Sequence, residues 1–267
     1  MAGKSRDLSI PWPFAPKEVK LNTDTNLIKL VAMAAMLIDH MGAALFPQYR
    51  ILRIIGRLAF PIYAYCLTVG CVYTHDMVKY VERLLLLALI SQPFYVIGLH
   101  HDNNLMYLYS FTKEPLRAFL QFYKYSWNTP SIYLALLMGV LTIWSIRERR
   151  LIITLSLVML CWLIQQKLMN FSYGWKGIVL MVLFYLFADK PILSFPLVAA
   201  FMFWWGRQSG GYNWLGLRFG TQLFAMLALP LIYIPMRSGL RLNKWIFYFF
   251  YPAHLALIIV LDKFVLP

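Results

Sequence analysis

The stretch LIKLVAMAAMLIDHMGAALF, residues 27–46, decides the fold class of this chain. Its twenty residues are enough to cross the hydrocarbon core of a bilayer as an α-helix. The same apolar character recurs along all 267 residues, of which 61% are hydrophobic and 13% are charged, with a mean hydropathy of +0.62. A soluble domain is typically about 25% charged. The sequence therefore predicts an all-α, polytopic transmembrane helix bundle.

Further apolar stretches of helical length follow the first one, so we expect about nine spans and no second domain. The expected spans are Leu27–Phe46, Leu52–Tyr73, Val81–Gly98, Ile132–Ile146, Leu151–Gln166, Gly174–Ala188, Ile192–Trp205, Phe219–Pro235 and Trp245–Phe264. We expect a polar amino-terminal segment over residues 1–26 and a single transmembrane domain over residues 27–267. The segment over residues 1–26 has no apolar core of the kind a cleavable signal peptide needs. The long aromatic loop over residues 100–130 suits an amphipathic segment at the membrane interface.

The chain carries a net charge of +14, and its basic residues cluster between the apolar stretches. The positive-inside rule and anionic lipid headgroups explain such clusters, so we expect membrane lipids as partners and no nucleic acid. A phosphate-bearing cofactor is the alternative explanation. Fourteen Lys and Arg residues fall on the amino-terminal side and 11 on the other, which predicts a cytoplasmic amino terminus. Three cysteines inside apolar stretches predict neither a disulfide framework nor a metal site.

Ionisable residues inside spans are costly and mark functional sites. Asp39 lies on a face of small residues, to which another helix can come close. Arg53 and Arg57 share one face of the next span because they are four residues apart. We therefore expect a buried Asp39–Arg57 pair, which either serves catalysis or only holds the two helices in register.

His40 follows Asp39 directly and so points about 100° away from it around the helix. The two residues are poor direct partners, and His40 must face a separate polar space. His254 lies at a similar depth in the last span, so we expect the two imidazoles to share one cavity. Such a His40 could act as a general base, or it could simply hydrogen-bond a neighbouring helix.

Five stretches together resemble the TraX family of pilin acetylases. They are LIKLVAMAAMLIDHMGAALFP (27–47), LRIIGRLAFPIYAYCLTVG (52–70), RLLLLALISQPF (83–94), YGWKGIVLMVLFYLF (173–187) and KWIFYFFYPAHLALII (244–259). More distantly, His40 and the Phe60–Pro61 pair are similar to a wider class of membrane acyltransferases, which includes the lysosomal heparan-sulfate acetyltransferase.

The resemblance implies an enzyme of the bacterial cytoplasmic (inner) membrane that takes an acetyl group from acetyl-CoA, with no metal. It implies a peptide or pilin amino terminus, or a surface glycan, as the acceptor. We expect the catalytic residues to be His40, Asp39, Arg57 and His254. We expect the phosphates of acetyl-CoA to bind among Arg83, Arg147, Arg149, Arg150, Arg237 and Lys244.

Two other functions stay open at this point. Asp39, His40 and His254 could form the proton relay of a transporter, although the chain shows no inverted repeat. The protein could also be a non-catalytic membrane assembly factor in which the polar residues serve packing alone.

Overall fold

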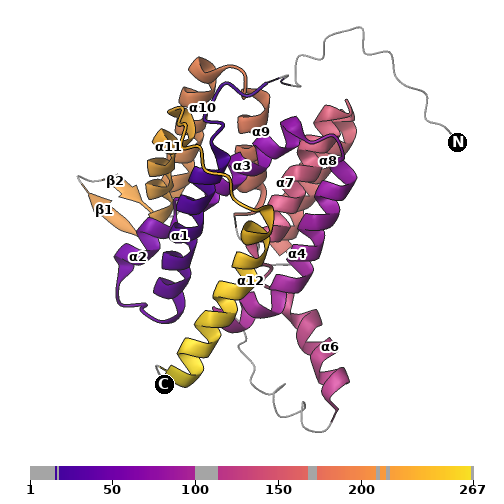
Figure 1. Cartoon of the computed structure of the whole chain (residues 1–267), viewed down its shortest axis with the longest axis vertical. Coiled ribbons are helices and arrows are strands. Elements are labelled where there is room, and N and C mark those ends of the chain that lie inside the picture. Colours follow the sequence, from indigo (N-terminus) through magenta and orange to yellow (C-terminus); the bar gives the residue numbers. More distant parts are fainter. Residues whose placement is uncertain are drawn as a thin grey trace, which may run out of the picture.

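The computed structural model describes residue 16 and residues 18–99, 114–167, 173–208, 211–214 and 217–265. Long helices lie side by side in one bundle (Figure 1). The α-helices are α1 (Thr25–Ala44), α2 (Arg50–Gly56), α3 (Ala59–Tyr73), α4 (Met77–Gly98), α6 (Pro115–Ser126), α7 (Ile132–Arg147), α8 (Leu151–Lys167), α9 (Gly174–Leu186), α10 (Pro191–Gln208), α11 (Leu229–Tyr233) and α12 (Lys244–Val260). A 3₁₀ helix, η1 (Thr221–Ala228), precedes α11, and a π-helical turn, η2 (Leu261–Val265), follows α12.

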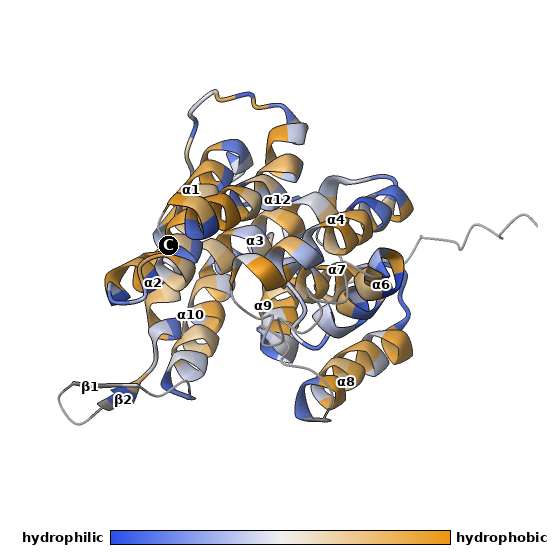
Figure 2. Ribbon diagram, turned by 90° about the horizontal axis from the view of Figure 1, so that it is seen from below, coloured by the Kyte–Doolittle hydropathy of each residue, from blue (hydrophilic) through white to orange (hydrophobic). Residues whose placement is uncertain are grey.

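Four helical stretches are long and apolar enough to cross a membrane. They are Thr25–Ala44, Arg50–Tyr73, Met77–Gly98 and Trp245–Val265. Figure 2 shows that the helices are mostly hydrophobic and that hydrophilic residues gather at helix ends and loops. Large apolar side chains also face outward, such as Ile152 and Ile192, which are 83% and 86% exposed. An outer surface of this kind suits lipid rather than water. The chain is thus an all-α membrane protein, as predicted; the count of nine spans stays a prediction.

Hydrogen bonds between connecting segments define two ends of the bundle, which we call the Thr25 end and the Ala44 end after the limits of α1. At the Thr25 end, the Asp24 side chain caps α1 and also accepts from the backbone of Ser238. Hydrogen bonds from the side chain and the backbone of Ser238 lower the pKa of Asp24 from its ordinary value. At the Ala44 end, the Lys176 ammonium donates to Gln208, which joins the start of α9 to the end of α10.

The second expected span, over residues 52–73, is not one continuous helix. It divides into α2 and α3 at Arg57 and Leu58. Pro61 supplies the physical reason, because a proline lacks the N–H that would bond the carbonyl four residues earlier and its ring crowds that carbonyl. The break bends the chain where Arg57 leaves the helix.

The eighth expected span, over residues 219–235, also differs from the prediction. It is built from η1 and the short helix α11 rather than from one α-helix. Before it, β1 (Tyr212–Trp214) pairs antiparallel with β2 (Leu217–Phe219) in a small hairpin. Of the predicted interfacial loop, the structure describes the last part, where α6 forms an amphipathic helix; residues 100–113 lie outside the described ranges.

Candidate active site

The buried carboxylate of Asp39 connects α1 to α2 and to the residue that follows α2. One Asp39 oxygen accepts from the Arg57 guanidinium at 2.6 Å, and the other accepts from Arg53 at 2.8 Å. Arg53 also donates to the Asp39 carbonyl at 3.0 Å, and Arg57 donates to the Arg53 carbonyl at 3.2 Å. The expected Asp39–Arg57 pair is confirmed, with Arg53 as a second partner.

Glycines let α1 and α2 come close enough for this pair to form. A Cβ atom on Gly56 would collide with the Asp39 side chain, and one on Gly42 would come within 2.5 Å of the Leu52 Cβ. Only glycine removes this obstacle, because every other residue carries a Cβ. Gly42 on α1 and Gly56 on α2 therefore bring Asp39 within reach of both arginines.

Two histidines from opposite ends of the sequence meet beside this cluster. His40 Nδ1 and His254 Nε2 are 2.7 Å apart, and the rings stack with centroids 5.0 Å apart. His254 Nδ1 lies 2.7 Å from the Phe250 carbonyl oxygen, one helical turn earlier in α12. His40 is 8% exposed and His254 is 4% exposed, so this contact is shielded from solvent.

The Phe250 carbonyl sets the tautomers of both rings. A carbonyl oxygen only accepts, so His254 Nδ1 must carry the proton. In a neutral His254 the Nε2 atom then accepts, and His40 must donate through Nδ1. A neutral His40 therefore carries its basic lone pair on Nε2. The second ring fixes which nitrogen of the first is the base, as hydrogen-bonded partners of functional histidines generally do.

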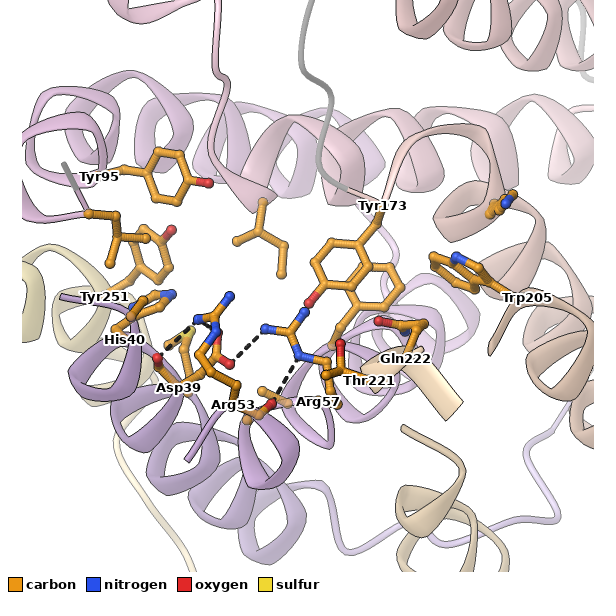
Figure 3. Close-up of a pocket in the computed structure, with 18 of the residues that line it drawn as sticks. Asp39, His40, Arg53, Arg57, Tyr95, Tyr173, Trp205, Thr221, Gln222 and Tyr251 are labelled. Carbon is orange, nitrogen blue, oxygen red and sulfur yellow. Dashed lines mark hydrogen bonds and ion pairs between the residues drawn. The ribbon is translucent and has the colours of Figure 1, made fainter. Parts of the chain in front are cut away.

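His40 lines a cavity of about 500 Å³ that lies toward the Ala44 end of the bundle. Figure 3 shows His40 and Asp39 on one side of it and Trp205 on the other, with Arg57 and Tyr173 between them. Its lining comes from α1, the α2–α3 junction, α4, α7, α8, α9, α10, η1 and α12. The charged residues in that lining are Asp39, Arg53, Arg57 and Lys176. Three cations against one carboxylate give the cavity an excess of positive charge.

Tyr251 brings an unpaired hydroxyl to the same cavity. Its ring meets the His40 ring edge-on, with centroids 5.9 Å apart. The residue is 2% exposed, and its hydroxyl has no hydrogen-bond partner among the described residues. A buried polar group without a partner costs free energy and calls for an explanation. This buried hydroxyl is a candidate donor to a ligand of the cavity that Tyr251 lines.

The structure brings together the four residues predicted for catalysis, with one refinement. Asp39, His40 and Arg57 line the cavity, whereas His254 contacts His40 but is not among the lining residues. The expectation that both imidazoles share one cavity is therefore not met: the two rings contact each other directly, and of the two only His40 lines the cavity.

The six basic residues predicted to bind the cofactor are not brought to this cavity. They are Arg83, Arg147, Arg149, Arg150, Arg237 and Lys244. Arg147 donates to the carbonyls of Cys71 and Thr74 and so joins the ends of α3 and α7 at the Thr25 end. Arg237 lines a separate shallow hollow beside Thr25. The side chain of Lys244 lies outside the described part of the chain.

Sequence reasoning did not single out Tyr173 or Lys176, although both lie in a stretch that carries the family resemblance. Tyr173 has a φ of 63°, a conformation that non-glycine residues seldom adopt. It stacks on Phe60 at a centroid distance of 3.8 Å and lies beside Arg57 (Figure 3). Such strain is often found at functional sites, but a left-handed tyrosine leaves no mark in the sequence.

A metal centre finds no support in the part of the chain that the structure describes. No group of three or more His, Cys, Asp or Glu side chains there could hold a metal ion. The functional groups among the lining residues are imidazole, guanidinium, ammonium, carboxylate, phenol, amide and hydroxyl groups.

The chain matches one protein family and is similar to two known proteins. The model of the TraX protein family matches residues 24–262. The chain is 26% identical over 254 residues to the probable fimbrial assembly protein FimC, serogroup H1, of Dichelobacter nodosus, with 86% of this chain and 92% of that relative covered. A stretch of 40 residues is 48% identical to an uncharacterised protein of Rickettsia prowazekii (strain Madrid E), which covers 15% of this chain and 16% of that protein. No solved structure matches.

Proposed function

Because the chain belongs to the TraX protein family, we propose that its cavity is the active site of a membrane-embedded acetyltransferase. The donor is acetyl-CoA, and the acceptor is an amine or hydroxyl group of a peptide, a pilin-type subunit or a cell-surface molecule. The observation that carries the proposal is the chain of contacts from the Phe250 carbonyl through His254 to His40. It presents a basic nitrogen at the edge of a 500 Å³ cavity.

His40 is the general base in this proposal. As the acceptor attacks the thioester carbonyl carbon, its proton passes to His40 Nε2. The C–S bond then breaks, and the departing thiolate takes that proton from His40 Nε2. His254 is a positioning residue, because it accepts from His40 Nδ1–H and supports the positive charge that His40 carries between the two steps. General-base catalysis of this kind typically contributes 10²–10⁴-fold to the rate.

The Tyr251 hydroxyl is the proposed donor to the oxygen of the reacting carbonyl. Arg57 donates to the Asp39 carboxylate and the Arg53 carbonyl, and both ring nitrogens of His254 already take part in hydrogen bonds. Tyr251 is buried, adjoins the His40 ring and has a hydroxyl without a partner among the described residues. A hydrogen-bond donor fixed in place before the reaction stabilises developing negative charge without reorganisation.

The positive charge of the cavity favours a neutral nucleophile. Arg53, Arg57 and Lys176 outnumber Asp39 in its lining, and nearby like charges disfavour the protonated form of an incoming amine. An amine acceptor would therefore enter in the form that can attack. The name of the Dichelobacter nodosus relative, a probable fimbrial assembly protein, supports a subunit of a surface fibre as the acceptor.

The test is acetyl transfer from radiolabelled acetyl-CoA to acceptors in membranes, with purified variants added back. We expect His40→Ala to lose 10²–10⁴-fold in rate while it stays folded and still binds acetyl-CoA. His254→Leu should lose less, and His254→Gln should recover part of that loss, because a glutamine carbonyl can again accept from His40. The control is His75→Ala, since His75 is exposed just before α4 and lies outside the cavity.

Two results would contradict the proposal. Near-normal transfer by His40→Ala would remove the general base. Assembly of surface fibres that continues unchanged in cells with His40→Ala, together with no acetyl transfer by the wild type, would favour a non-catalytic assembly role.

A further inference from the structure

A second cavity, of about 340 Å³, lies between α1, α3, α4, α7 and α12. It follows α3 from Tyr63 to Tyr73, and those ten residues span about 15 Å of helix. Its lining is apolar apart from hydroxyl groups, most of them of tyrosines, and one charged side chain, Lys29. A long space of this volume suits one extended chain and not a folded nucleotide.

The charged end of this cavity lies at the Thr25 end of the bundle. Lys29 is one turn into α1, and its ammonium lies 5.2 Å from the centroid of the Phe247 ring. Among the residues that the structure describes, no carboxylate forms an ion pair with Lys29. Thr25 lines both this cavity and the shallow hollow that holds Arg237 and Arg241. Arg237 and Arg241 thus lie near the end of the cavity that holds Lys29.

The other end of the cavity abuts the active site. Tyr63 and Tyr133 line it there, and the Tyr133 ring meets the Tyr251 ring edge-on at a centroid distance of 4.8 Å and an angle of 76°. Tyr251 lines the cavity of His40. The contact between the two tyrosine rings is therefore a wall shared by the two cavities.

We propose that the second cavity is the passage for the pantetheine chain of acetyl-CoA, an inference that rests on the proposed function. The phosphates bind at Lys29, Arg237 and Arg241, and the chain extends along α3 toward Tyr251. The thioester meets the Tyr251 hydroxyl when the two tyrosine rings part. The acceptor reaches His40 from the first cavity, so donor and acceptor enter from opposite ends of the bundle.

Charge and distance both support this passage. Phosphates form charge-assisted bonds with Arg and Lys side chains, and Lys29, Arg237 and Arg241 lie at the Thr25 end. His40 lies 15 residues along α1 from Thr25, about 22 Å of helix, so a phosphate bound there needs a long linear chain to bring its thioester to the base. Tyrosine hydroxyls along an apolar wall suit a chain that carries amide groups.

The experiment measures acetyl-CoA binding and steady-state transfer in two variants of the full-length protein. Lys29→Met should raise the Kd and KM for acetyl-CoA about tenfold and leave kcat within twofold of the wild type. Acetyl-pantetheine has no phosphate, so its KM should not change. Leu67→Trp, which fills the cavity from α3, should weaken acetyl-CoA binding by at least tenfold.

The matched control for Lys29 is Lys79→Met, since Lys79 is an exposed lysine at the same end of the bundle that pairs with Asp76 and lies outside both cavities. Folded Lys29→Met and Leu67→Trp proteins that bind acetyl-CoA with wild-type affinity would overturn the passage and leave the proposed function in place. A phospholipid retained in the cavity that acetyl-CoA does not displace would also overturn it. Wild-type protein that binds no acetyl-CoA would instead contradict the proposed function itself.

Discussion

At the scale of single residues, Asp39 pairs with two guanidinium groups at once. Replacing Asp39 should therefore cost more stability than replacing one of its arginines. Asp39→Ala leaves Arg53 and Arg57 without their anion inside the bundle, and an uncompensated buried charge costs about 3–5 kcal/mol. Arg57→Ala should cost less, because Asp39 keeps Arg53 at 2.8 Å. Thermal unfolding in detergent should show this order, with the double variant recovering part of the Asp39→Ala loss.

This order of stability losses distinguishes an Asp39 that pairs with two arginines from one that pairs with Arg57 alone. Equal losses in the two single variants would mean that Arg53 does not support Asp39. Strictly additive losses in the double variant would mean that Asp39 and Arg57 do not interact, since only residues that interact depart from additivity.

At the scale of elements, Gln92 of α4 joins three segments through one side chain. Its amide nitrogen donates to the carbonyls of Ser126 and Thr129, and its amide oxygen accepts from the Ser131 backbone at 2.9 Å. Gln92 is fully buried. It therefore satisfies the backbone where α6 ends and α7 begins.

Gln92→Leu should destabilise the protein by about 2–5 kcal/mol, because it leaves buried donors and acceptors unpaired. Gln121→Leu is the control, since Gln121 is exposed on α6 and its replacement should change stability by less than about 0.5 kcal/mol. Chemical unfolding monitored by tryptophan fluorescence measures both. A Gln92→Leu protein as stable as the control would mean that this connection does not depend on Gln92.

At the scale of the whole molecule, we expect the Thr25 end to face the cytoplasm, because the sequence assigns 14 of the 25 Lys and Arg residues to the amino-terminal side of the expected spans. The check is labelling of single exposed cysteines with a membrane-impermeant maleimide. Gln48→Cys, between α1 and α2, should react in intact cells, whereas Lys190→Cys should react only after permeabilisation. The three native cysteines are buried, which keeps the background low. The opposite pattern would place the cavity of His40 on the cytoplasmic side.

The sequence by itself determined the helical class, the first and third spans to within a few residues, and the pairing of Asp39 with Arg57. Helical periodicity carries this information, because it sets which direction each side chain takes around its own helix. His40 and Asp39 point in different directions around α1 because of the same 100° step between adjacent residues. Even the break between α2 and α3 has a local cause, Pro61, although the continuous apolar stretch concealed it.

Only the tertiary structure decided which helices face each other and how far each is shifted along its axis. His40 and His254 are 214 residues apart in sequence, and a hydrogen bond of 2.7 Å between them depends on how α1 and α12 rotate and slide in the packed bundle. The ring contacts of Tyr251, the position of Tyr173 and the separation of the six predicted cofactor-binding basic residues from the cavity of His40 depend on that packing too. Periodicity gives a direction for each side chain, but only contact among all the helices gives it a neighbour.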